Sequence, residues 1–82
     1  MATIRETLRA ATARLERAGV AIPDHDAAML LAHVLDEDML MMKFNSHRQL
    51  GEEDAQAFEA LLARREKREP LQYIIGKQTS WG

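Results

Sequence analysis

The chain has 82 residues, a formal net charge of −2 and no cysteine. This length fits one small domain. Without cysteine the chain can form neither a disulfide nor a thiolate metal site, which is compatible with the reducing cytoplasm where we expect it. The acidic balance weighs against nucleic acid as a direct partner, and no apolar run approaches the roughly 18 residues of a membrane-spanning helix. We therefore expect a monomer that contacts neither nucleic acid nor a membrane.

The first expected helix begins after Thr3. Residues 3–6 carry the pattern of a capping box, in which the Thr3 hydroxyl accepts from the backbone N–H of Glu6 and the Glu6 carboxylate reaches back. Apolar residues then recur at three- and four-residue spacing as far as Ala18, and Gly19 is suited to end a helix. The pattern predicts an amphipathic helix of about four turns.

Residues 27–35 are apolar except for His33. We expect a second helix here, starting at Asp24 or Asp26 after a connector over residues 20–23, because acidic residues favour the positive end of a helix. A helix that is apolar nearly all round belongs at the centre of a bundle. The three histidines lack metal-ligand spacing, so His33 is interpreted as a partly buried side chain hydrogen-bonded to a neighbour.

A short methionine-rich segment follows three consecutive acidic residues, the last of which is Asp38. Those acids lack the glycine and the distal glutamate of a calcium loop, so they are interpreted as a solvated link, with Asp38 capping a third helix over residues 39–44. On that helix Met39 and Met42 share one face and Met41 points elsewhere. Because methionine surfaces adapt to partners, Met41 is a candidate partner-binding residue, although packing on the bundle is the simpler explanation.

The fourth expected helix follows a polar loop over residues 46–51, in which Leu50 is expected to pack inward. Three acidic residues occupy its first turn and four basic residues its last turns, so both ends complement the helix dipole. The basic run is interpreted as a solvated helix end, with docking of an acidic partner surface as the alternative. The candidate partner-binding residues in this run are Arg64, Arg65 and Arg68.

The fifth expected helix is short, with Pro70 at its first position, an apolar face over residues 71–75 and Gly76 as its end. Residues 77–81 alternate weakly and predict the first residues of a β-strand. The sequence thus predicts an all-α, compact bundle of about five short helices, orthogonal or up-down, with a C-terminal tail starting toward a β-strand. We expect residues 1–76 to form the helical domain and residues 77–82 to start a linker strand to a further domain.

The residues show no recognisable catalytic chemistry. The four glycines stand singly, so no cofactor-binding loop can be built from them, and no Ser, His and Asp combination has the pattern of a nucleophilic triad. We therefore expect no catalytic, cofactor-binding or metal-binding residue in this chain.

Two stretches resemble the release-factor glutamine methyltransferases, the HemK/PrmC family. Residues 26–35, Asp-Ala-Ala-Met-Leu-Leu-Ala-His-Val-Leu, are similar to the family pattern DAxxLLxHVL. The segment that begins at Leu61-Leu62-Ala63-Arg64-Arg65 and continues with residues 69–76 resembles LLxRR…EPLxYIxG. The resemblance spans nearly the whole chain, and the second segment is the more specific of the two. Trp81 stands where the family more often has Phe.

The resemblance implies a helical N-terminal domain of an enzyme that uses S-adenosylmethionine to methylate the glutamine of the Gly-Gly-Gln loop in peptide chain release factors. It also implies a C-terminal methyltransferase domain that carries the glycine-rich loop and an Asn-Pro-Pro-Tyr motif, neither of which occurs in these residues. The implied role of this part is to bind and orient the release factor. The alternatives are a purely structural bundle that stabilises the catalytic domain and a free-standing helical interaction module.

Overall fold

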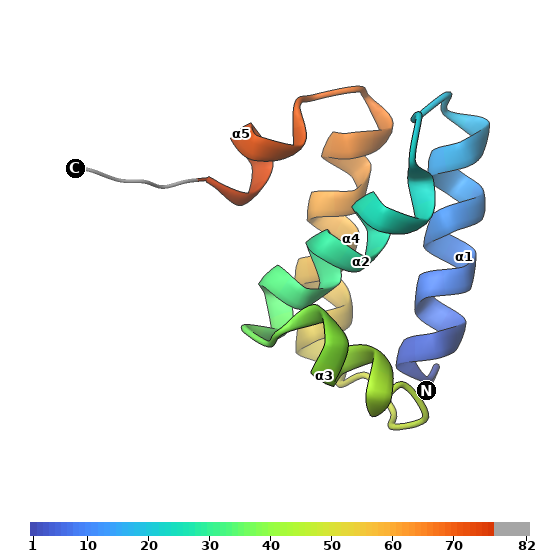
Figure 1. Cartoon of the computed structure of the whole chain (residues 1–82), viewed down its shortest axis with the longest axis vertical. Coiled ribbons are helices and arrows are strands. Elements are labelled where there is room, and N and C mark those ends of the chain that lie inside the picture. Colours follow the sequence, from blue (N-terminus) through green and yellow to red (C-terminus); the bar gives the residue numbers. More distant parts are fainter. Residues whose placement is uncertain (77–82) are drawn as a thin grey trace.

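The computed structural model describes residues 1–76 and confirms the all-α prediction (Figure 1). The predicted strand start at residues 77–81 lies outside the described residues. Within residues 1–76 the only β-type pairing is an isolated bridge between Thr3 and Gln49. The helices, in chain order, are α1 (Ile4–Arg17), α2 (Pro23–Leu35), α3 (Met39–Phe44), α4 (Glu52–Glu66) and α5 (Leu71–Ile75).

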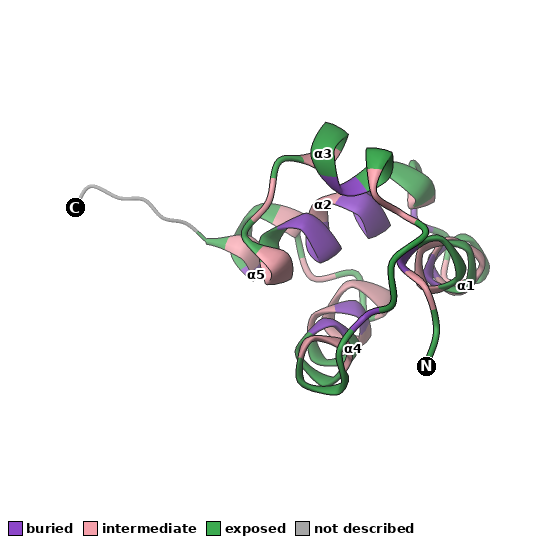
Figure 2. Cartoon of the chain, turned by 90° about the horizontal axis from the view of Figure 1, so that it is seen from below, coloured by how far each residue is buried: buried purple, intermediate pink, exposed green. Residues whose placement is uncertain are grey.

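Helix α2 is the centre of the bundle, as predicted, because it contacts each of the other four helices. In Figure 2 much of the α2 ribbon has the colour of buried residues, and the other helices surround it. Burial of these side chains removes apolar surface from water and supplies most of the stability of such a small domain. The residues of α2 that are buried are Asp26, Ala27, Ala28, Leu30, Leu31 and Ala32.

Helix α2 begins one or three residues earlier than predicted, depending on which aspartate is taken as its start. It starts at Pro23, and Ile22 occupies the N-cap position without a side-chain hydrogen bond. The preset φ of proline and its missing N–H suit the first helical position, so no Asp cap is needed. Asp24 and Asp26 lie in the first turn, where their charges still favour the helix dipole. The prediction that either aspartate starts the helix is therefore wrong.

Helix α1 confirms both of its predicted ends. The Thr3 backbone N–H donates to Glu6 Oε1 at 2.9 Å and the Glu6 N–H donates to Thr3 Oγ1 at 3.1 Å. At the other end Gly19 has a φ of 85°. Its N–H bonds the Glu16 carbonyl, while the N–H of the buried Val20 bonds the Leu15 carbonyl. This pair of bonds is a Schellman motif, which requires a left-handed residue at the glycine position.

The loop between α3 and α4 lies against the N-terminus of the chain. The Ile4 N–H donates to the Arg48 carbonyl at 3.0 Å and the Arg5 N–H donates to the Ser46 carbonyl at 2.9 Å. The Leu50 N–H donates to the Ala2 carbonyl at 2.9 Å, and Leu50 is buried as predicted. These bonds satisfy orphan N–H groups of the first turn of α1 and fix α3 beside it.

Helix α5 begins one residue later than predicted. Pro70 has an extended conformation, with φ −57° and ψ 137°, and takes the N-cap position before Leu71. Ile74 is buried against the core, and Gly76 closes the helix with a φ of 75°, as predicted. The C-terminal end of α4 and the N-terminus of α5 lie at one end of the molecule, opposite α3 (Figure 1).

Candidate protein-interaction surface

Helix α3 is fixed to the bundle by one side chain and by its cap. Met42 is fully buried, with 0% of its surface exposed. The Asp38 carboxylate accepts hydrogen bonds from the N–H groups of Leu40 and Met41, at 3.0 and 3.4 Å, as an N-cap should. Met39 is partly buried on the same face as Met42. The two anchors determine which side of this six-residue helix faces solvent.

The outward face of α3 carries three large apolar side chains. Leu40 is 78% exposed, Met41 56% and Phe44 82%. Residues three and four apart on a helix are neighbours, so Phe44 adjoins both Met41 and Leu40. The prediction that Met39 and Met42 share one face while Met41 points elsewhere is confirmed, and the structure shows that the shared face is the inner one. A contiguous exposed group of apolar residues is typical of an interaction site, whereas single exposed residues are common. We call Leu40, Met41 and Phe44 the α3 face.

A basic hollow lies on the neighbouring part of α1. Arg5, Arg9 and His47 line it together with Thr3 and Glu6, and its volume is about 320 Å³. His47 comes three residues after Phe44, and the Arg5–Ser46 backbone bond holds this loop against α1. The α3 face and the basic hollow are therefore brought together by the packing of the α3–α4 loop on the first turn of α1.

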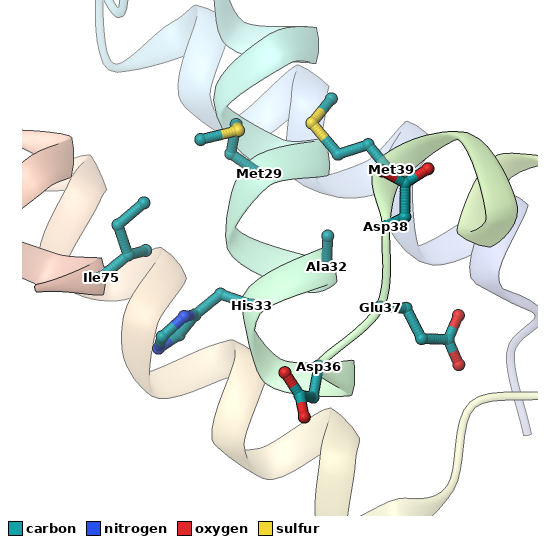
Figure 3. Close-up of a pocket in the computed structure, with 8 residues that line it drawn as sticks. All are labelled: Met29, Ala32, His33, Asp36, Glu37, Asp38, Met39 and Ile75. Atoms are coloured by element: carbon teal, nitrogen blue, oxygen red, sulfur yellow. The ribbon is translucent and has the colours of Figure 1, made fainter. Parts of the chain in front are cut away.

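A second concave region, of about 450 Å³, lies between α2, α3 and α5 (Figure 3). Met29, Met39 and Ile75 approach it from the three helices, and His33 and Asp36 line its lower part. His33 is exposed, so the prediction of a partly buried histidine is wrong. Its side chain lines this groove, which is open to solvent, together with Asp36 and with Ile75 of α5. The remaining residues of the lining are Ala32, Glu37 and Asp38.

Two of the three carboxylates in this groove are already used by the fold. Glu37 forms an ion pair with Arg48, and Asp38 caps α3. Asp36 ends α2 in the left-handed conformation, with a φ of 54°. Within residues 1–76, no group of three His, Asp or Glu side chains is placed to hold a metal ion. The acidic segment is thus a capped link between two helices.

The predicted basic partner-binding residues lie at the opposite end of the molecule from Met41. Arg64 pairs with Glu69, with Nε 2.8 Å from Oε1. Arg65 pairs with the buried Asp26. Arg68 is exposed, has a φ of 72°, and donates from Nη1 to the Ala18 carbonyl at 2.9 Å. The structure therefore does not bring Met41 and the three arginines together, and partner binding by any of them stays a prediction.

A further arginine network joins α1 to α4. The Arg14 guanidinium makes paired hydrogen bonds to Glu59, at 2.7 and 2.9 Å, and to Glu66, at 3.2 and 2.7 Å. These bonds hold the pKa of Glu66 below its ordinary value and raise that of Arg14. Arg64 lowers the pKa of Glu69 in the same way. Most arginines outside the basic hollow are therefore engaged in internal pairs.

Sequence patterns alone did not single out Leu40, Phe44, Arg5 and Arg9 as members of one surface. Helical periodicity could have indicated Leu40 and Phe44, because both lie on the side of α3 opposite Met42. Arg5 and Arg9 lie off the apolar stripe of α1 and are exposed, but the helical pattern does not indicate what lies beside them. Only the packing of the α3–α4 loop on α1 shows that these residues adjoin.

Comparison with known proteins places these elements in a family. The sequence pattern of the family described as PrmC N-terminal domain matches residues 6–76. The release factor glutamine methyltransferases of Corynebacterium glutamicum and Vibrio cholerae are 45% and 38% identical to the chain, over 93% and 96% of its length. The bifunctional methyltransferase of Rickettsia conorii is 40% identical over 90% of the chain. No solved structure matches significantly.

The chain spans only part of each of these relatives. The matched region is 26% of the Corynebacterium protein, 28% of the Vibrio protein and 14% of the Rickettsia protein. Within residues 1–76, every helix is too short or too polar to cross a lipid bilayer. The match over residues 6–76 covers all five helices except the first two residues of α1. The chain therefore belongs to the PrmC N-terminal domain family.

Proposed function

We propose that this domain recognises the protein substrate of a release factor glutamine methyltransferase. It helps to hold and orient a peptide chain release factor in the cytoplasm, while another part of the enzyme transfers a methyl group from S-adenosylmethionine to the Gly-Gly-Gln glutamine. Family membership and the names of the Corynebacterium and Vibrio relatives support the substrate class. The residues of this chain do not fit a cofactor site, because the glycines stand singly and form no glycine-rich loop.

The observation that carries the proposal is the α3 face. Its three large apolar side chains are 56–82% exposed and adjoin one another, which is typical of a surface that contacts another protein. A glutamine side chain on a loop offers few contacts near the reacting amide. Contacts remote from that amide can supply binding energy and positioning, and they lower the cost of aligning the substrate.

The test is removal of residues 1–76 from the methyltransferase that carries this domain. We expect KM for the intact release factor to rise about tenfold or more, because remote contacts are lost. KM for a short peptide containing Gly-Gly-Gln should change little, because such a peptide is too short to contact this domain while its glutamine is at the reaction site. Circular dichroism would verify that the remaining enzyme is folded. A purely structural role predicts instead a lower melting temperature with unchanged KM for the intact factor, and that outcome would refute the proposal.

A further inference from the structure

We infer that the α3 face and the basic hollow together bind an acidic segment of the release factor that also carries aliphatic or aromatic side chains. This inference rests on the proposed function and names the surface and the chemistry of its partner. The α3 face supplies the apolar contact, and Arg5, Arg9 and Lys43 supply the charge.

The apolar part has the properties of an energetic centre for binding. Leu40 and Phe44 lie four residues apart on the outer side of α3, and Met41 adjoins Phe44. The fully buried Met42 on the inner side holds the helix in place, so the surface is presented on a fixed element. Binding energy at protein interfaces is concentrated in a few large side chains that become desolvated, and methionine adapts to the shape of a partner.

The charge of the neighbouring residues selects an acidic partner. Within residues 1–76, Arg5, Arg9 and Lys43 form no ion pair, whereas Arg14 and Arg48 do. The carboxylate in the hollow, Glu6, is engaged by the Thr3 N–H in the capping box. The acidic first turn of α4 follows the α3–α4 loop, and its Asp54 lies close enough to Arg48 to stabilise that charge. A basic surface on a chain of net charge −2 therefore favours acidic groups on the partner.

The other charged regions fit a partner less well. Arg64 and Arg65 already neutralise Glu69 and Asp26, so binding an acidic partner there would require breaking internal pairs. In the groove between α2, α3 and α5, Glu37 is paired with Arg48. The α3 face and the basic hollow thus combine exposed apolar area with charges that the fold leaves available.

The first experiment measures binding of the chain to an intact release factor by isothermal titration calorimetry. We expect the double variant Leu40→Ala/Phe44→Ala to weaken binding about tenfold or more, because it truncates large side chains that become buried in the complex. The matched control is Ile22→Ala/Tyr73→Ala, which removes side chains that are 59% and 69% exposed on other elements. Both double variants should keep the wild-type melting temperature. Equal affinity of the α3 variant and the control would overturn the inference.

The second experiment reverses the charge of the hollow with Arg5→Glu/Arg9→Glu. Both arginines are exposed and have no ion pair within residues 1–76, so the fold should be kept, and the melting temperature of the variant would verify this. We expect weaker binding of the release factor, and a smaller decrease in affinity than the wild type shows between about 0.05 and about 0.3 M salt. If the reversal abolishes binding of an RNA to the chain and leaves release-factor affinity unchanged, the surface binds nucleic acid and the inference fails.

Measurement of KM in the methyltransferase that carries the domain separates this inference from the proposed function. If the α3 variant raises KM for the intact factor as much as deletion of residues 1–76 does, the proposed function and this inference both hold. If deletion raises KM and the α3 variant does not, the domain recognises the factor through another surface and only the inference fails. If neither change raises KM, the proposed function fails as well.

Discussion

Arg65 donates a hydrogen bond from Nε to Asp26 Oδ2 at 2.8 Å, and this pair joins the last turn of α4 to the first turn of α2. The two side chains are only 17% and 10% exposed. A second hydrogen bond, from Arg65 Nη1 to the Glu69 carbonyl at 2.7 Å, extends the contact to the residue before Pro70. One arginine therefore connects α2, α4 and the turn that leads to α5.

Loss of either member of this pair should destabilise the domain strongly. We expect Asp26→Ala or Arg65→Ala to lower the free energy of unfolding by about 3 kcal/mol, because the remaining charge stays buried without its partner. Urea denaturation followed by circular dichroism would measure this loss of unfolding free energy. The control Arg64→Ala breaks the more exposed pair with Glu69 and should cost much less. The prediction would be contradicted if the buried and exposed pairs gave the same loss.

The two sides of α3 should respond differently to truncation. We expect Met42→Ala to lower the free energy of unfolding by about 3 kcal/mol, because it leaves a cavity at a fully buried position. Leu40→Ala, on the same short helix, should change it by less than about 0.5 kcal/mol, because Leu40 is mostly exposed. Thermal and urea unfolding of both variants would check this. A large loss with Leu40→Ala would mean that the α3 face contributes to the core.

The pairs formed by Arg14 and Arg64 should make stability fall in acid. The pKa values of Glu66 and Glu69 are held below their ordinary value of 4.5 by these arginines. Carboxylates with a lowered folded-state pKa stabilise the protein above 4.5, and this contribution is lost as the pH falls through the lower folded-state value. We expect Arg14→Gln to reduce stability at neutral pH and to make the decline below pH 4.5 shallower.

Urea denaturation at a series of pH values from about 7 to about 2 would measure this dependence. The matched control is Arg9→Gln, because Arg9 is exposed and has no ion pair within residues 1–76. The control should have the same pH profile as the wild type. Parallel curves for wild type and Arg14→Gln below pH 4.5 would show that the Arg14 pairs contribute nothing to acid stability.

Much of the fold could be predicted from local patterns. The capping box at Thr3, the glycine end at Gly19, and the inward Leu50 all depend on interactions within a few residues, and the structure confirms them. The central position of α2 followed from its composition. The start of α2 differs from the prediction because Pro23 itself takes the first helical position, and the start of α5 differs because Pro70 takes the N-cap position before Leu71.

The candidate surface was harder to predict because it depends on long-range contacts. No local sequence pattern indicates that Arg65 forms an ion pair with Asp26, which lies 39 positions away in the sequence. Nor does a local pattern place the loop after Phe44 against the first turn of α1. Periodicity places Met42 on one face with Met39, but which face of α3 is buried, and the 82% exposure of Phe44, depend on which helices pack nearby.

The connection made by Arg65 has a mechanical consequence. Because it holds the Glu69 carbonyl and because Ile74 is buried, α5 cannot swivel independently of the other helices. A displacement of α3 can reach α5 through α2, because α2 contacts both helices. The end of the domain that carries α3 and the end that carries Gly76 are thereby mechanically connected (Figure 1).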